Sequence, residues 1–201
     1  MQTARAITVS EANGRASIYL AALSGNLIAL AFIGQMSRLG AAFYAFALIL
    51  LPVLAFVGVV TFVRLVQSSI EDIAYAHRIA LLRNFYVSLA PELEPYIVLV
   101  RGAPSTAPET LAPSAWQLTL TAAGMVAVVN SVVVAACVGL VVEASGADSL
   151  AIPVCVGAVV GAGAFSLHER HHRRVLDASS PEAVDRAAIF VPQSPQAERS
   201  A

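Results

Sequence analysis

Residues 39–63 read LGAAFYAFALILLPVLAFVGVVTFV, a stretch that holds no charge between Arg38 and Arg64. About 25 residues at ~1.5 Å each form a helix of ~37 Å, which is longer than the ~30 Å hydrocarbon core of a bilayer. A run of this length predicts a transmembrane helix that is long enough to tilt, rather than a helix buried in a soluble core.

The composition extends this conclusion to the rest of the chain. The 201 residues are 58% hydrophobic and only 12% charged, whereas a soluble domain carries about 25% charged residues. So little charge cannot cover a water-facing surface, and the lipid bilayer must therefore surround much of the chain. The net charge is −1, so no nucleic-acid partner is expected.

Three more uncharged runs complete a four-span pattern, and they cover residues 16–37, 116–142 and 149–167. The first could be a secretory signal, but it is longer than the about 7–15 apolar residues of a signal peptide, which favours an uncleaved span. We predict an all-α integral membrane protein with two transmembrane helical hairpins (four spans) and a cytosolic helical stalk. The expected segments are a cytosolic N-terminal tail (1–16), transmembrane hairpin 1 (17–66), a cytosolic stalk and loop (67–115), transmembrane hairpin 2 (116–167), and a basic juxtamembrane segment with a flexible cytosolic tail (168–201).

The arginines indicate which way the spans run. In the four-span arrangement eleven of the twelve arginines lie on one side, and only Arg38 falls on the other. Arginine is enriched in loops on the cytoplasmic side of a membrane. We therefore expect both termini and the stalk to face the cytosol, in a multi-pass protein of the bacterial inner (plasma) membrane.

Small residues spaced four apart mark the predicted helix contacts. Gly25 belongs to such a row with Ala21 and Ala29, and Gly157 and Gly161 form a GxxxG motif. Rows of this kind let two helix backbones approach closely. The GxxxG motif fits a contact between copies of the chain and a contact within one chain equally well.

Asn26 and Asn130 are the strongly polar groups near the middle of the spans, where an amide usually faces other helices rather than lipid. Pro52 leaves the carbonyl of Leu48 without its helical partner. Asn26 lies at about the same depth and is one candidate donor, while local bending of the helix is the other explanation.

The link between the last two runs is centred on about Gly146, and this centre indicates which residues lie level with each other. Asn130 is expected level with Ala162, beside Gly161 and Gly163, where small partners leave room for its amide. Cys137 and Cys155 are expected at similar depth, either as a disulfide or as the more common free thiols.

Residues 67–90 carry charges and still keep a helical period, with one apolar stripe made of Tyr75, Ile79, Leu82, Tyr86 and Leu89. The period predicts a helical stalk that continues the second span. The stripe fits packing against the N-terminal tail or the loops of the same chain, and it also fits a seam between two copies.

A family resemblance lies in the same region, on the residues His77-Arg78-Ile79, Arg83-Asn84-Phe85-Tyr86 and Leu89-Ala90-Pro91-Glu92. Over residues 15–96 the chain resembles uncharacterised four-span membrane proteins of actinobacteria. The resemblance implies a fold and no activity. It directs attention to Arg83, Asn84, Phe85 and Tyr86 as a surface for a cytosolic protein partner, with simple packing of the stalk as the other explanation.

The segment His168-Glu169-Arg170-His171-His172 matches the H-E-x-x-H pattern, in which two histidines bind zinc and the glutamate activates water. An arginine inside the pattern disfavours a metal cation, and no third ligand is evident. We interpret the segment as a basic juxtamembrane stretch that attracts anionic lipid headgroups, ahead of adventitious metal binding and of catalysis. No metal or cofactor is expected.

No ionisable residue lies at the centre of any of the four runs, which argues against a proton-coupled transporter. We predict a non-enzymatic membrane scaffold or interaction protein whose partners are the bilayer, a second copy of the chain and a cytosolic protein at the stalk. A small oligomeric channel or membrane-perturbing effector is the alternative, and a zinc-dependent membrane hydrolase is a remote one.

Overall fold

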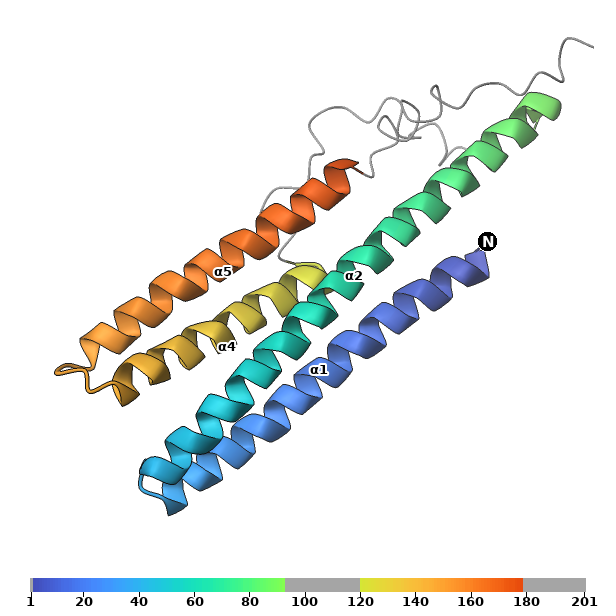
Figure 1. Cartoon of the computed structure of the whole chain (residues 1–201). Coiled ribbons are helices and arrows are strands. Elements are labelled where there is room, and N and C mark those ends of the chain that lie inside the picture. The colour runs from blue at the N-terminus through green and yellow to red at the C-terminus, as the bar shows by residue number, and fades with distance from the viewer. Residues whose placement is uncertain (1, 93–119, 179–201) are drawn as a thin grey trace, which may run out of the picture.

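The computed structural model describes residues 2–92 and 120–178. The predicted loop that ends at residue 115, the beginning of the predicted third span and the predicted flexible tail from residue 179 lie outside the described residues. Four helices make up the described part: α1 (Gln2–Met36), α2 (Ala41–Leu89), α4 (Ala122–Ala144) and α5 (Ala151–Ala178) (Figure 1). Each of them is long and apolar enough to cross a membrane. The predicted all-helical class and the four candidate spans are thereby confirmed.

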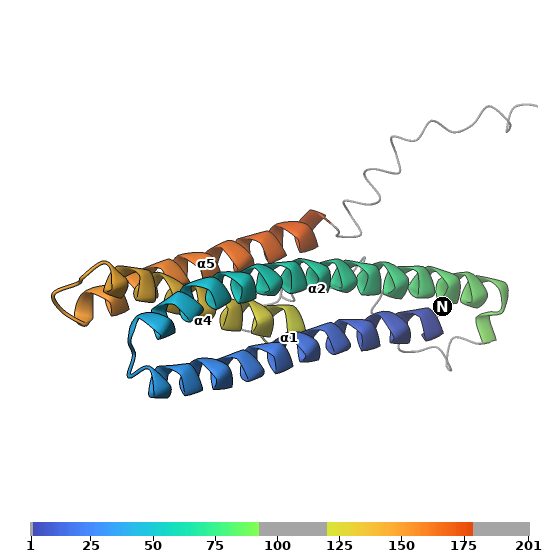
Figure 2. The same cartoon turned by 60° about the horizontal axis from the view of Figure 1, so that its bottom comes forward.

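The helices pack in the order of the chain. α1 lies against α2, α2 against α4 and α4 against α5, whereas α1 and α4 or α2 and α5 touch only locally. Figures 1 and 2 show the result as an open row of long rods. The two ends of the row, α1 and α5, each keep a face that no other described helix covers.

The lengths of the helices differ in an informative way. α4 has 23 residues and is therefore ~35 Å long, about one bilayer crossing. α2 has 49 residues and is ~74 Å long, far more than one crossing requires. The excess length of α2, the N-terminal turns of α1 and the C-terminal turns of α5 lie at the same end of the row (Figure 1). The predicted N-terminal tail and the basic segment after residue 167 are thus largely helical.

Two tight turns connect the helices at the opposite end. Between α1 and α2, Arg38 and Leu39 adopt left-handed backbone conformations with φ of 48° and 57°. The amide of Leu39 donates to the carbonyl of Gly34 at 2.9 Å and that of Gly40 to the carbonyl of Ser37 at 2.9 Å, which satisfies one carbonyl at the end of α1 and one in the turn. Between α4 and α5, Gly146 has a φ of 85°, a conformation that glycine adopts without strain.

The buried core lies where α1, α2 and α4 meet. One cluster includes Tyr19, Phe62, Leu65 and Val126. A second cluster, closer to the turns, includes Leu51. Many other large apolar side chains are exposed on the outside of the row, as expected for a surface that faces lipid rather than water.

The structure gives Asn26 a different partner from the predicted one. α2 continues through Pro52 as one helix. The side-chain amide of Asn26 donates to the carbonyl of Ala22 in its own helix, at 2.7 Å. The bond from Asn26 to the carbonyl of Leu48, one of the two explanations offered for Pro52, is therefore replaced by a bond within α1, because a short amide side chain reaches the preceding turn of its own helix more easily than a neighbouring helix.

Candidate functional site

A buried polar contact joins three of the helices. The side chain of Asn130 on α4 is 0% exposed, and its Oδ1 accepts a hydrogen bond of 3.3 Å from the hydroxyl of Tyr19 on α1. On α2, a Cβ at Gly58 would collide with Oδ1 of Asn130 and lie 2.7 Å from the Tyr19 hydroxyl oxygen. Glycine at position 58 therefore makes the space in which this hydrogen bond forms.

The amide nitrogen of Asn130 is buried and has no hydrogen-bond partner among the described residues. A buried donor without a partner costs ~1–3 kcal/mol. Sequence reasoning picked out Asn130 as a helix-facing group and expected it level with Ala162, with its amide among the small residues of α5. In the structure the amide oxygen lies instead at Tyr19 on α1 and Gly58 on α2. The prediction missed Tyr19 and Gly58, although a glycine between large apolar residues was the available signal.

The GxxxG motif serves a contact within the chain. A Cβ at Gly157 would lie 2.6 Å from the carbonyl oxygen of Ala135 on α4, and one at Gly161 would lie 2.8 Å from the Cβ of Ala135. Real Cβ atoms do not approach other atoms so closely, so both glycines are needed for α5 to lie against α4. Of the two contacts that the motif could make, the structure shows the one within a single chain.

A groove runs beside this contact on the outer face of α4 and α5. It consists of two adjoining hollows of about 370 and 530 Å³. Both are lined mainly by small and branched apolar side chains, and they share Val132, Ala135 and Ala158. The groove extends from Leu150, just before α5, along the helix to Phe165, a distance of ~22 Å at ~1.5 Å per residue.

The small-residue row on α1 is open at Gly25 in the part of the chain that the structure describes. A Cβ added at Gly25 would meet no atom within 4 Å, and Asn26 beside it is half-buried and bonded to its own helix. Ile28 and Phe32 further along α1 are exposed as well. The part of this row around Gly25, which sequence reasoning assigned to helix packing, is therefore an open surface within residues 2–92 and 120–178.

The predicted stalk residues lie on the last turns of α2, beyond the N-terminal end of α1 (Figure 1). The side chains of Phe85 and Tyr86 are 57% and 56% exposed, and their ring centroids are 6.3 Å apart. Arg83 is also exposed, and Asn84 belongs to the same helix. Arg83, Phe85 and Tyr86 form no part of either core cluster.

The residues of the H-E-x-x-H pattern pack against α2. The ring of His168 lies edge-on to the buried ring of Phe62 with centroids 4.6 Å apart, and His172, which is 2% exposed, lies 6.2 Å from the same ring. Glu169 forms an ion pair of 2.9 Å with Arg173. Across residues 2–92 and 120–178, no three histidine, cysteine, aspartate or glutamate side chains come together to hold a metal.

The two cysteines are free thiols, with Cys137 half-buried and Cys155 exposed. The disulfide that the sequence left open is therefore not formed. Their equal distance from the link predicts a similar depth on neighbouring helices. A disulfide also requires that the two side chains point toward each other.

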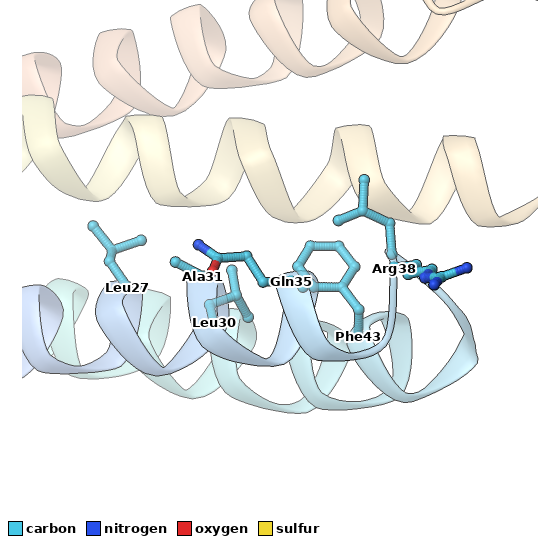
Figure 3. A pocket seen from close by; sticks show the side chains of 8 residues that line it. Leu27, Leu30, Ala31, Gln35, Arg38 and Phe43 are labelled. Atoms are coloured by element: carbon cyan, nitrogen blue, oxygen red, sulfur yellow. The ribbon is translucent and has the colours of Figure 1, made fainter.

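A further hollow, which sequence reasoning missed, lies at the turn between α1 and α2 (Figure 3). Its volume is about 580 Å³, and it is lined by Leu27, Leu30, Ala31, Gly34, Gln35, Arg38, Leu39 and Phe43. The lining is apolar except at the turn itself, where Gln35 and Arg38 lie. Both of these side chains are exposed.

Comparison with known protein families, with curated proteins and with solved structures gives no match for this chain.

Proposed function

We propose that the chain is a multi-pass protein of the bacterial inner membrane, with two transmembrane hairpins, a cytosolic stalk and both termini in the cytosol, and that it acts as a non-enzymatic scaffold that associates with itself. The arginine distribution supports the orientation, because Arg38 lies at the turns while Arg15, Arg64 and Arg170 lie on the opposite side of the predicted spans. The relation to the actinobacterial four-span family is part of this proposal.

The observation that carries self-association is the open groove along α4 and α5. Lipid tails are as apolar as helix surfaces, so helices associate in a membrane mainly by close packing, and small residues permit it. The groove is ~22 Å long, whereas one leaflet of the hydrocarbon core is only ~15 Å thick. A helix fills such a groove along its whole length, while the tail of a single lipid does not.

The occupant that fits this groove is the α1 face around Gly25 of a second copy. α1 and the pair α4–α5 are the two ends of the row, so joining them is a head-to-tail contact, and such contacts close into rings when the rotation permits. The row at Gly25 is free to approach a second backbone, since no atom lies within 4 Å of the position of its Cβ.

Single-molecule photobleaching of the labelled protein in nanodiscs tests self-association. We expect more than one bleaching step for the wild type and a shift toward single steps for Gly25→Leu and for Ala158→Leu, which fill the two faces. Gly14→Leu is the matched control, because Gly14 is as open as Gly25 but lies outside the uncharged run. A wild-type protein that is monomeric at high density in the membrane would exclude the proposal.

The last turns of α2 are the proposed surface for a cytosolic protein. Exposed aromatic and aliphatic side chains are normal in lipid, but in water a contiguous patch of them marks an interaction site. A photoreactive amino acid at Phe85 should form a discrete crosslinked product in native membranes, and one at Ser10, on the exposed part of α1, should not. Equal labelling at the two positions would remove this surface from the proposal.

An oligomeric channel lined by asparagines draws less support. Asn130 is enclosed by Tyr19 and Gly58 and so is turned away from any axis between copies. Ion flux through vesicles that contain the protein, compared with empty vesicles, separates the scaffold from the channel. Equal leakage would remove the channel.

A further inference from the structure

The hollow at the turn between α1 and α2 combines an apolar slot with a charged mouth. Figure 3 shows Leu27 at one end, Phe43 in the middle and Arg38 at the turn. We propose that this hollow is a binding site for one anionic phospholipid, whose acyl chain lies along the slot and whose phosphate is held at Arg38 and Gln35. The inference depends on the helices lying in a bilayer, and it is independent of self-association.

The dimensions of the slot match one leaflet. From Leu27 to Met36, the last residue of α1, the helix rises by nine residue steps (36 − 27), about 14 Å along its axis, and Arg38 lies in the turn just beyond. Half of the ~30 Å hydrocarbon core is ~15 Å. The slot therefore accepts the tail of a lipid whose headgroup lies level with Arg38, whereas a transmembrane helix needs a surface twice as long.

The walls of the slot are held in place by the turn. Gly34 is buried beneath Leu39 and Phe43, and a Cβ at Gly34 would lie 3.3 Å from the Cδ2 atoms of both side chains. The hydrogen bond from the Leu39 amide to the carbonyl of Gly34 fixes Leu39 over the end of α1. These contacts leave the apolar surface formed by Leu27, Ala31 and Phe43 uncovered.

The charge at the mouth points to an anion. Arg38 is exposed, and within the described ranges it forms no ion pair. It is also the arginine that the distribution of positive charge leaves unexplained, since the other eleven lie on the opposite side of the predicted spans. A guanidinium offers two parallel N–H donors to a phosphate, and the amide of Gln35 adds a further donor one turn away.

The binding test uses the full chain in nanodiscs made of equal parts phosphatidylglycerol and phosphatidylcholine. Native mass spectrometry of the released protein counts the retained lipid. We expect the wild type to retain phosphatidylglycerol preferentially and Arg38→Gln to lose about fivefold of that preference, the effect of one arginine near a charged headgroup. Arg64→Gln, which removes one exposed charge from the other side, should retain the wild-type preference.

Further variants and probes distinguish the contribution of the lipid tail to binding from that of the headgroup. Ala31→Phe fills the slot and should reduce retention of both lipids, whereas Ala22→Phe, exposed on α1 outside the hollow, should not. Glycerol phosphate, which has no tail, should neither bind nor compete. The helical circular dichroism of every variant is compared with that of the wild type, and a slot variant that loses helicity is replaced by Ala31→Leu.

Four results would overturn the inference. The first is an unchanged phosphatidylglycerol preference in Arg38→Gln, and the second is unchanged lipid retention in Ala31→Phe. The third is competition by glycerol phosphate, which would make the mouth a site for free phosphate. The fourth is a wild-type protein that retains no lipid and whose turn between α1 and α2 is covered by a second copy of the chain. That result would assign the hollow to an oligomer contact and end the lipid proposal.

Discussion

Replacing Gly58 by alanine tests whether the contact of Asn130 with Tyr19 organises α1, α2 and α4. The added Cβ would collide with Oδ1 of Asn130 and lie 2.7 Å from the hydroxyl oxygen of Tyr19. Asn130 is completely buried and has little room to move. The substitution must therefore displace the amide and break the hydrogen bond that Tyr19 donates.

Three effects set the size of the change. Overpacking a well-packed core costs ~1–3 kcal/mol, and an interhelical hydrogen bond in a membrane protein contributes ~0.6 kcal/mol. Alanine is favoured over glycine inside a helix by up to ~1 kcal/mol. The balance is a loss of about 1–2 kcal/mol in the free energy of unfolding.

The assay is reversible unfolding in mixed micelles with increasing SDS, followed by circular dichroism. Gly163→Ala is the control, because a Cβ there meets no atom within 4 Å, and it should stabilise the protein by up to ~1 kcal/mol. In the Asn130→Ala background the collision with Asn130 is absent, and the Tyr19 hydroxyl, which would lie 2.7 Å from the new Cβ, can move into the space that the amide leaves. There, Gly58→Ala should be neutral or mildly stabilising.

The comparison between the two backgrounds decides the outcome. Residues in direct contact give a coupling energy that differs from zero, whereas independent residues give additive effects. An equal cost of Gly58→Ala with and without the Asn130 side chain would refute the reasoning, as would a wild-type background in which Gly58→Ala behaves like Gly163→Ala.

Three further changes follow from the same packing. Phe62→Ala removes a fully buried ring that contacts the histidines of α5 and should cost ~3–5 kcal/mol in the SDS assay, with a loss near 1 kcal/mol counting against the packing. Gly161→Leu places a large side chain against Ala135 and Ser131 and should separate α5 from α4, which a fall in energy transfer between probes on these helices would report; unchanged transfer would be contrary to the contact. Thr121→Ala removes the hydroxyl that accepts from the amide of Gly124 at 3.0 Å and should cost ~1 kcal/mol, so full stability would argue against the cap.

The sequence was sufficient to predict the helices, because the length and apolarity of a run are local properties of the chain. The uncharged run from 39 to 63 lies within α2 and its N-terminal turn, and the GxxxG motif does let two backbones approach. The partner of Asn130 could not be predicted in the same way. Counting from a link gives the depth of a residue, but the face of the helix on which it lies depends on how three helices pack together.

The spacing of small residues alone also could not show which surfaces stay open. Gly25 and Gly157 occur in similar rows, yet one is uncovered and the other is packed against Ala135. Which row becomes internal depends on which helices are neighbours in the folded chain. The hollow at Arg38 depends on the left-handed conformations of two residues that are not glycine, for which no sequence pattern gave a signal.

Cysteine labelling in intact cells tests the central claim, that four helices cross the membrane with the stalk inside. Cys137 and Cys155 are first replaced by alanine, and single cysteines are then introduced at Ser145, in the link between α4 and α5, and at Ser88 on the last turn of α2, both of which are exposed. A membrane-impermeant maleimide should label the cysteine at 145 in intact cells and the one at 88 only after permeabilisation. Labelling at 88 from outside, or a protein that remains in solution without detergent, would contradict the account.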